Sequence, residues 1–240
     1  MDAIITNNLS KKYKDKLAVS SLNLNIKNGE LFSLLGTNGA GKTTSIKMLS
    51  TLILPTSGEA KVYGYNIDKE SQKIKEIINV SPQETAIAPN LTVLENLNFM
   101  AGIYKIKNKK EKIDELIKIF RLEEVLKQKA KTLSGGWQRK LSIALALINN
   151  PKVLFLDEPT LGLDVIARKE LWTVIENLKG KITIILTTHY MEEAEKLSDR
   201  VGIMNKGKLI KIGTVKELIS KTKTKNLEDA FVKLVTGGEE

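Results

Sequence analysis

Residues 36–43 fit the pattern G-x-x-x-x-G-K-[ST], whose chemistry is the binding of a chain of phosphate groups. Glycine lets the backbone fold back so that successive N–H groups point at an anion, and a following helix adds the positive end of its dipole. We expect Lys42 to reach the β- and γ-phosphates of a nucleoside triphosphate and Thr43 to offer its hydroxyl to phosphate-bound Mg²⁺. The candidate phosphate contacts are Gly36, Asn38, Gly39, Ala40, Gly41, Lys42, Thr43 and Thr44.

The alternative for this loop is a glycine-rich turn that carries a surface lysine. An apolar stretch, residues 30–35, precedes the loop, and a helix-forming stretch, residues 44–52, follows it. Because a phosphate loop requires a strand and a helix in this order, the flanking sequence favours triphosphate binding over the plain turn.

Two carboxylates, Asp157 and Glu158, follow directly after the apolar residues 153–156. We expect a buried strand to deliver both acids at its carboxyl end, where an unpaired charge would be costly. Mg²⁺ is the expected partner of Asp157, through its water shell, whereas Glu158 is expected to project the other way and to take a proton from an attacking water. The alternative is a strand that merely ends in acidic surface residues, which leaves the pairing with the phosphate loop unexplained.

Two further polar side chains stand at predicted strand ends. Gln83 follows the predicted strand at residues 77–80, and His189, the only histidine, follows the one at residues 181–186. Sheets of this class hold ligand groups at such ends, so we expect His189 to contact the γ-phosphate. The alternative for His189 is an incidental polar residue, and a glutamine at a strand end means little by itself.

A second expected anion-binding terminus is formed by Ser134, Gly135 and Gly136, which precede the predicted helix at residues 140–148. Free N–H groups at a helix start and a serine hydroxyl all offer donors to an anion. The alternative is a helix cap with a flexible lead-in. Asp164 is expected to cap another helix, at residues 165–179.

The elements around these motifs predict an α/β fold: a P-loop NTPase core with a small antiparallel β subdomain and an inserted α-helical subdomain. Residues 84–131 are almost free of glycine and show helical spacing, and Thr92 with Glu95 makes a capping box. We therefore predict a helical lobe at residues 84–131 and a nucleotide-binding lobe at residues 1–83 and 132–240. Other predicted elements are strands 4–9, 17–26 and 58–63 with a basic turn at 11–16, helices 69–76, 93–104, 109–120, 122–126 and 191–197, a hairpin at 200–204 and 208–212, and a closing helix at 227–234.

Composition limits the possible partners and location. The chain has 240 residues, no cysteine, 42% hydrophobic residues and a formal net charge of +10. It shows no apolar run of the roughly 18 residues that a membrane span needs, and no signal-peptide core at its start, so a cytoplasmic location is expected. Because only four basic residues are arginine and lysine is spread along the chain, we interpret the charge as solvated surface and expect no nucleic-acid partner. Attraction to an anionic membrane leaflet is the weaker alternative.

The order of these motifs resembles the nucleotide-binding subunit of ATP-binding cassette (ABC) transporters over nearly the whole chain. Residues 133–136, L-S-G-G, match the signature sequence of that family and are its most specific part. The resemblance implies that ATP and Mg²⁺ are bound between two cassettes, a second copy or a homologue, in a head-to-tail dimer in which each signature closes on the partner's ATP. It also implies that Tyr13 stacks on adenine, that Gln83 senses Mg²⁺ and the membrane subunit, and that Asp164 crosses the interface.

Residues 35–44, 156–164 and 226–237 look most like bacterial cassettes of the daunorubicin-resistance and sodium-export type, which pair with a separate membrane permease. Trp137 departs from the pattern, since glutamine is common there, and residues 127–132 lack the T-x-V-G-E-x-G run of exporters with fused membrane domains. The expected function is ATP hydrolysis that powers export, by a cassette peripheral to the inner face of the cell membrane. The alternatives are a soluble cassette ATPase acting on ribosomes or DNA and, less favoured, a kinase that uses the same loop.

Overall fold

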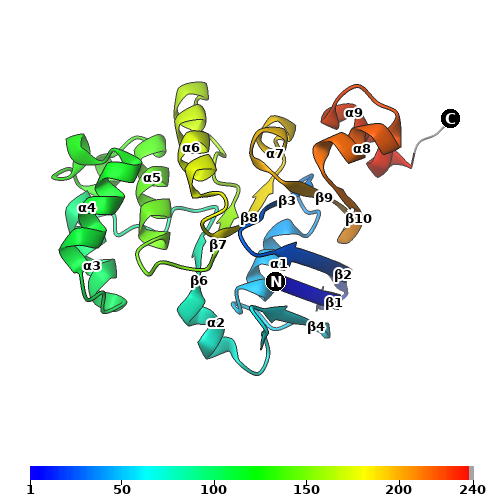
Figure 1. The fold of residues 1–240 in the computed structure, drawn as a ribbon, viewed down its shortest axis with the longest axis horizontal. Coiled ribbons are helices and arrows are strands. Elements are labelled where there is room, and N and C mark those ends of the chain that lie inside the picture. Colours follow the sequence, from blue (N-terminus) through cyan, green and yellow to red (C-terminus); the bar gives the residue numbers. More distant parts are fainter. Residues whose placement is uncertain (238–240) are drawn as a thin grey trace.

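The computed structural model describes residues 1–237, which form two β-sheets surrounded by helices (Figure 1). Within these residues the elements are β1 (Asp2–Tyr13), β2 (Lys16–Lys27), β3 (Leu31–Gly36), α1 (Lys42–Leu49), β4 (Ser57–Val62), β5 (Tyr65–Asn66), α2 (Ser71–Ile77), β6 (Ile78–Ser81), α3 (Val93–Ile103), α4 (Lys109–Phe120), η1 (Glu123–Val125), η2 (Ala130–Thr132), α5 (Gly135–Ala146), β7 (Val153–Asp157), α6 (Val165–Leu178), β8 (Thr183–Thr188), α7 (Met191–Leu197), β9 (Arg200–Asn205), β10 (Lys208–Gly213), α8 (Val215–Thr222) and α9 (Leu227–Thr236).

The larger sheet has the strand order β10-β9-β3-β8-β7-β6. Its strands are parallel from β9 to β6, and every residue of β3, β7 and β8 is buried. Burial on both faces explains why these strands are continuously apolar in sequence. The register pairs Leu35 with Thr188 and Asp157 with Thr187, so the carboxyl ends of β3, β7 and β8 lie at one edge.

Alternate residues of β7 belong to two different cores. Leu154 and Leu156 pack with the helices α3 to α6, whereas Val153 and Phe155 pack with α1 and the smaller sheet. Figure 1 shows the same layering, with α6 and α7 above the strands, α5 at their left next to α4, and α1 with the smaller sheet below them. The mixed α/β fold expected from sequence is confirmed.

The smaller sheet is antiparallel, with the order β2-β1-β4-β5. Its long hairpin contradicts the predicted turn at residues 11–16, because Lys11 pairs with Val19 and Tyr13 pairs with Lys16. A turn confined to two residues is possible because Lys14 adopts a left-handed φ of 49°. Register shifts also bend the hairpin, which hides the strict alternation that a sequence pattern would reveal.

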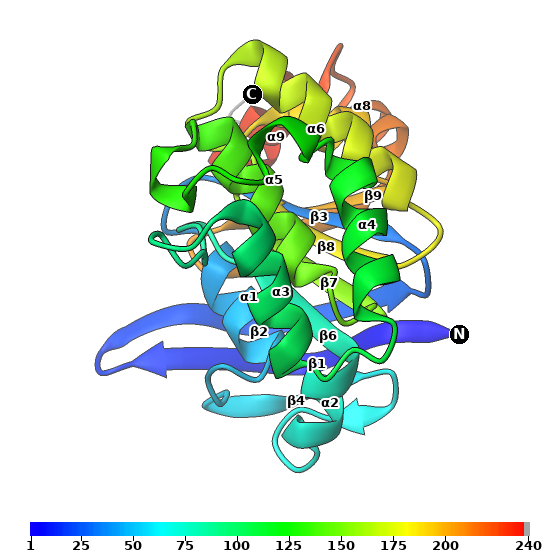
Figure 2. The same ribbon diagram turned by 90° about the vertical axis from the view of Figure 1, so that its left-hand side faces the viewer.

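Residues 84–131 hold α3, α4, the short 3₁₀ turn η1 and the first two residues of η2, and Figure 2 shows α3 and α4 at the outer side of the molecule, next to α5. The capping box is confirmed: Thr92 Oγ1 accepts from the Glu95 N–H at 3.2 Å, and the Glu95 carboxylate accepts from the Thr92 N–H at 2.8 Å. The predicted helix at 122–126 shortens to η1. Because one continuous core joins Phe120 to the sheet residue Leu156, the division into lobes stays a prediction, and its residues 238–240 lie outside the described part of the chain.

One helix begins earlier than predicted, and another was not predicted. The helix α5 begins at Gly135 rather than at residue 140, since both glycines and Trp137 continue into its first turn. The helix α8 went unpredicted, although Thr214 and Glu217 form a capping box at its start. The helices α8 and α9 cover one end of the molecule through Leu218 and Phe231.

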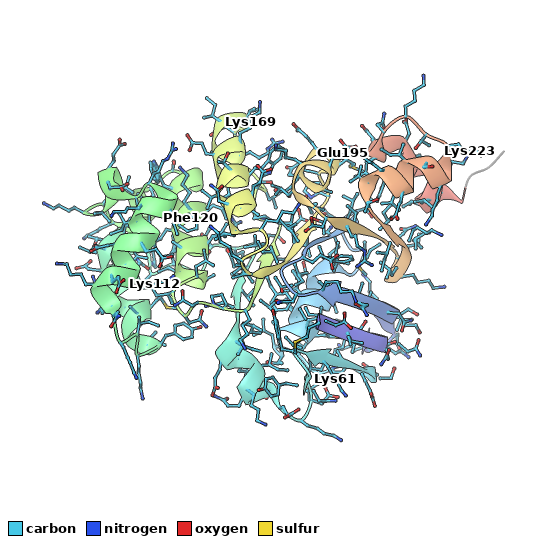
Figure 3. The ribbon with its side chains drawn as sticks, in the orientation of Figure 1. Lys61, Lys112, Phe120, Lys169, Glu195 and Lys223 are labelled. Atoms are coloured by element: carbon cyan, nitrogen blue, oxygen red, sulfur yellow. The ribbon has the colours of Figure 1, made fainter. Side chains whose placement is uncertain are left out.

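The lysines lie on many elements rather than in one patch. Figure 3 shows Lys61 on β4, Lys169 on α6 and Lys223 beyond α8, all at different edges of the molecule. This distribution supports the interpretation of the charge as solvated surface. In the part of the chain from 1 to 237, none of the helices combines the length and the apolar character needed to cross a bilayer.

Candidate nucleotide-binding site

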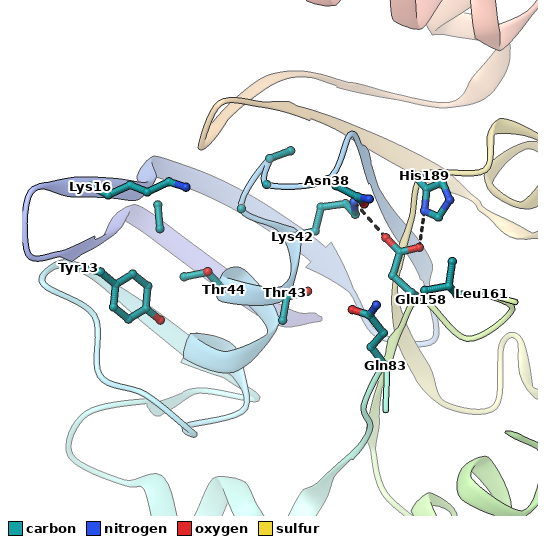
Figure 4. A pocket seen from close by; sticks show the side chains of 14 residues that line it. Tyr13, Lys16, Asn38, Lys42, Thr43, Thr44, Gln83, Glu158, Leu161 and His189 are labelled. Atoms are coloured by element: carbon teal, nitrogen blue, oxygen red, sulfur yellow. Dashed lines mark hydrogen bonds and ion pairs between the residues drawn. The ribbon is translucent and has the colours of Figure 1, made fainter. Parts of the chain in front are cut away.

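A cavity of ≈ 410 Å³ lies at the carboxyl ends of the parallel strands (Figure 4). It collects most of the residues predicted from sequence and three that were not predicted, Lys16, Ala18 and Leu161. The predicted side chains and loop residues that line it are Tyr13, Asn38, Gly39, Ala40, Gly41, Lys42, Thr43, Thr44, Gln83, Glu158 and His189. Gly36, Asp157, Ser134, Gly135, Gly136 and Asp164 are not among the residues that line it.

The phosphate loop needs its glycines for close backbone contacts. Gly41 has a φ of 101°, and a Cβ placed there would lie 2.6 Å from the Ala18 carbonyl oxygen. A Cβ on Gly36 would lie 2.5 Å from the Met204 carbonyl oxygen. Both distances are too short for a side chain, so glycine lets the loop settle between β2 and β9. Gly41 then caps α1 without a side-chain hydrogen bond, which leaves the first N–H groups of α1 for an anion.

The Lys42 ammonium is buried and fully engaged. It donates to the carbonyl oxygens of Gly36 at 2.7 Å and Thr37 at 3.2 Å, and Oε1 of Glu158 lies 3.0 Å away. The Lys42 and Glu158 side chains are only 5% and 6% exposed, so this ion pair is well shielded from water. The pair joins the phosphate loop directly to the end of β7.

The other oxygen of Glu158, Oε2, lies 2.7 Å from His189 Nδ1 (Figure 4). Because an ionised carboxylate only accepts, this contact places a proton on Nδ1. The backbone of Glu158 adopts a φ of 49°, a conformation that is uncommon outside glycine, and its N–H is held by the carbonyl and hydroxyl oxygens of Thr187. This turn carries the carboxylate toward Lys42 and His189.

Asp157 has different partners from Glu158. Its Oδ1 accepts from the Thr43 hydroxyl at 3.1 Å and from the Thr187 hydroxyl at 2.5 Å. The hydroxyl of Thr43, the carboxylate of Asp157 and the amide of Gln83 supply the hard oxygen ligands that Mg²⁺ prefers. Among residues 1–237 no group of three or more His, Cys, Asp or Glu is placed to hold a metal ion.

Ser134, Gly136 and Asp164 lie together at the starts of α5 and α6. Ser134 caps α5 in an extended conformation and makes no side-chain cap bond. A Cβ on Gly136 would lie 3.1 Å from Ala167 Cβ, so glycine allows α5 to approach α6 closely. As predicted, Asp164 caps α6, and its pKa lies below the usual range chiefly because the Ala167 N–H donates to it.

Comparisons with known proteins agree with this geometry. A family model described as "ABC transporter" matches residues 19–161. The linearmycin resistance ATP-binding protein LnrL of Bacillus subtilis is 42% identical over 217 residues, which are 89% of this chain and 70% of LnrL. The human phospholipid-transporting ATPase ABCA3 is 45% identical over 198 residues, which are 82% of this chain but only 12% of that protein.

Solved structures show the same fold. An ATP-binding subunit of an ABC transporter matches with a TM-score of 0.87 and 27% identity, covering 97% of this chain and 99% of that one. The ATP-binding cassette MJ0796, in a dimeric post-hydrolysis state bound to ADP and Pi, matches with a TM-score of 0.80 and 28% identity, covering 88% and 98%. The chain therefore belongs to the ABC transporter family, as an ATPase cassette of the P-loop NTPase class.

Proposed function

We propose that this cassette hydrolyses ATP in a head-to-tail pair of cassettes and thereby powers export through a separate membrane permease. The observation that carries the hydrolytic part is the Glu158 carboxylate, held between Lys42 and His189 at the cavity. A carboxylate in this position can serve both as a partner of the phosphate-binding lysine and as an acceptor for the proton of a water.

ATP binding must rearrange the contacts of Lys42. The γ-phosphate is an anion that competes with Glu158 for the Lys42 ammonium, while the N–H groups at the start of α1 bind the other phosphate oxygens. Glu158 then keeps its contact with His189 and is free to accept a proton from the attacking water. The water oxygen bonds to the γ-phosphorus as the bond from the γ-phosphorus to the β–γ bridging oxygen breaks, and ADP is the leaving group. His189 Nδ1 orients the carboxylate during this step, and the proton passes from Glu158 to solvent once phosphate has left.

Thr43, Asp157 and Gln83 are the residues that would hold Mg²⁺, which when bound neutralises charge on the β- and γ-phosphate oxygens. Tyr13, 44% exposed at the end of β1, lines the same cavity and offers an open ring for adenine. Lys16 lies beside it and adds a positive charge.

The head-to-tail pair is supported by the residues that lie outside the cavity. Ser134 and Asp164 stand at the α5 and α6 starts, away from the chain's own phosphate loop, which suits contact with a partner's ATP. Apolar side chains are exposed beside Asp164: Val165 by 59% and Ile166 by 72%. MJ0796 is a dimer in its solved structures.

A permease has a suitable docking place at the edge between β6 and α3. A cleft of ≈ 790 Å³ there is lined by Leu52, Pro82, Ala86, Ile103 and Tyr104, among others, and the exposed Phe99 extends the apolar surface along α3. Because the cleft lies next to Gln83, a helix docked there could respond to nucleotide bound in the cavity.

The names of two relatives support export of drug-like cargo. One is LnrL, a linearmycin resistance protein. The other is YbhF of Escherichia coli, a probable multidrug transporter protein of which this chain matches 40% at 37% identity.

The test begins with the purified chain, in which ATP hydrolysis should be lost in Lys42→Ala. A tagged chain in its own cell should then co-purify with membranes together with a protein of several membrane spans. Retention on ribosomes or DNA, without any such membrane protein, would instead support the alternative of a soluble cassette ATPase.

A further inference from the structure

Arg139, on the second turn of α5, is a buried cation with an unusual set of partners. Only 4% of the residue is exposed. Its Nη1 donates to the Pro82 carbonyl oxygen at 2.7 Å, and its Nη2 donates to the Gln83 carbonyl oxygen. Among the described residues no carboxylate lies within ion-pair distance of the guanidinium. The guanidinium is therefore held by its hydrogen bonds to Pro82 and Gln83, which we call the Gln83 loop.

A buried cation without an ion pair is costly unless its donors are satisfied. Burial lowers the pKa of Arg139, and the more distant carboxylates Asp157 and Glu193 act in the opposite direction. Arg139 uses a separate nitrogen for each of two successive carbonyl oxygens, in a rigid planar group, whereas lysine has a single nitrogen on a flexible stem. The choice of arginine therefore fits a site that must hold two adjacent peptide groups.

A second contact joins the same helix to the same strand end. Ser142 follows Arg139 by three positions, so both face one side of α5. Its hydroxyl lies 3.0 Å from the hydroxyl of Ser81, the last residue of β6 and the neighbour of Pro82. Two points of attachment fix the orientation of α5 relative to the chain that leads into Gln83.

The other end of this connection is the helix start at Ser134. Gln138 braces it, because Nε2 donates to the carbonyl oxygens of Ala130 and Leu133, both at 3.2 Å. Ser134 and Arg139 are separated by about 8 Å of helix, a rigid distance. Gln83 lines the chain's own cavity, whereas Ser134 does not.

We propose that Arg139 is a positioning residue that makes the Ser134 terminus and the Gln83 loop move as one unit. The proposal rests on the proposed function: when Ser134 engages the partner's ATP, α5 is displaced, and the guanidinium carries that displacement to the Gln83 peptide in the chain's own site. Arg139 acts on hydrolysis through Gln83 and touches no nucleotide itself.

A double-mutant cycle tests this route. Arg139→Met keeps the length of the side chain and removes its donors. Gln83→Ala leaves the carbonyl oxygens that accept from Arg139 in place and removes the side chain that those contacts position. We expect Arg139→Met to lower kcat at least about tenfold, with little change in KM, because groups displaced by a fraction of an ångström lose rate. In the Gln83→Ala background the same change should lower kcat no further. Equal factors in both backgrounds would overturn the proposal.

Two variants guard against loss of folding. Arg139→Lys keeps the charge but offers one nitrogen in place of Nη1 and Nη2, so it cannot keep both contacts in the planar geometry of the guanidinium. Its kcat should fall nearly as far as that of Arg139→Met, and full activity in Arg139→Lys would contradict the need for two separate nitrogen donors. Lys140→Met is the matched control, a buried cation on the same helix that pairs with Glu170 at 2.7 Å, and should keep kcat. Failure of the proposed function appears separately, as hydrolysis by the parent that Lys42→Ala does not reduce.

Discussion

Glu158 and Lys42 form a buried ion pair in which Oε1 lies 3.0 Å from Nζ, while Oε2 of the same carboxylate contacts His189. The pair links the phosphate loop to the strand that carries the candidate base, although the two residues are far apart in sequence. In the proposed function this ion pair couples phosphate binding to the positioning of the base, because an anion that engages Lys42 would release Glu158.

Glu158→Gln should keep ATP binding and lose nearly all turnover. The amide preserves the size of the side chain and can still accept a hydrogen bond from Lys42, but it cannot take a proton from water. General bases contribute about 10²- to 10⁴-fold, so steady-state hydrolysis should fall by at least about a hundredfold. The variant should accumulate as an ATP-bound dimer in size-exclusion chromatography, and hydrolysis near the parent rate would remove Glu158 from the role of base.

The same variant should also be less stable without nucleotide. Removing one charge of a buried ion pair leaves the other charge uncompensated, which typically lowers the free energy of unfolding by about 3 kcal/mol or more. The loss should be smaller here, because two carbonyl oxygens still accept from Lys42. Saturating ATP should restore the melting temperature relative to the parent, since phosphate replaces the lost partner.

The sequence predicted the local parts of the site and missed the contacts that cross the fold. The phosphate loop, the acids after β7 and the helix capped by Asp164 are contiguous patterns, and each appears where it was predicted. Lys16 lines the cavity because it pairs with Tyr13 across the hairpin, and Leu161 lines it because it follows Glu158 by three positions, so neither contact needed a distant element. Arg139 lies 57 residues from Pro82 in sequence, and no spacing rule indicates such a pairing.

Glu193 gives a further example of a group that sequence could not identify. It is fully buried on α7, where its Oε1 accepts from Trp172 Nε1 at 2.9 Å and from the Thr160 hydroxyl at 2.8 Å. Its Oε2 is buried without a hydrogen-bond partner among the described residues. Burial raises the pKa of Glu193, and the nearby charge of Glu158 raises it further.

The stability of the protein should therefore depend on pH through Glu193. At pH values between the ordinary glutamate pKa of 4.5 and the raised pKa of Glu193, the unfolded chain releases this proton and the folded protein retains it. Folding therefore takes up a proton, so the free energy of unfolding falls as the pH rises through this range. The free energy of unfolding of the parent, minus that of Glu193→Gln, should decline by up to about 1.4 kcal/mol per pH unit in this window. Denaturant titrations at several pH values measure it.

Glu192→Gln is the control for this measurement, because the Glu192 side chain is 68% exposed on the same helix. Its stability difference from the parent should show far less dependence on pH. A parent and a Glu193→Gln variant that lose stability in parallel would show that Glu193 is charged in the folded protein.

Charge introduced at the proposed docking cleft should impair transport and leave the ATPase of the isolated cassette largely intact. Ala86 lines the cleft and Leu94 is 38% exposed on α3, so Ala86→Glu and Leu94→Lys alter the surface. Asn96 is not chosen for a charge substitution because it is buried and supports the backbone. Its Oδ1 accepts from the Ala88 N–H, and its Nδ2 donates to the Ala88 carbonyl oxygen. Lys110→Glu, on α4 and outside the cleft, is the control.

Efflux of the cargo and hydrolysis by the purified cassette are measured in parallel for this set. The docking assignment predicts that efflux falls in Ala86→Glu, whose residue lines the cleft, and in Leu94→Lys, whose residue is exposed on the neighbouring helix α3, and in neither the parent nor Lys110→Glu. Normal efflux in a variant whose permease contact is shown to be broken would place the docking surface elsewhere.

The shared-site arrangement predicts that two inactive variants rescue one another. Lys42→Ala removes the ammonium of the phosphate loop, and Ser134→Arg blocks the start of α5, where Ser134 makes no cap bond of its own. In a homodimer of either variant, both composite sites carry a defect. In a hybrid dimer, one site carries both defects, and the other combines an intact Lys42 from one chain with an intact Ser134 from its partner.

Mixing the two variants and letting the dimers re-equilibrate should therefore return some ATP-stabilised dimer and some hydrolysis. If Lys42 and Ser134 acted on ATP within one chain, every site would stay defective and mixing would restore nothing. Because strict coupling between the two sites could suppress hydrolysis in a half-intact dimer, bound nucleotide per dimer is measured as well, with hybrid formation confirmed by differently tagged chains. Confirmed hybrids that show neither signal above the unmixed variants would contradict a site built from two chains, and would leave the separation of Ser134 from the cavity without a functional explanation.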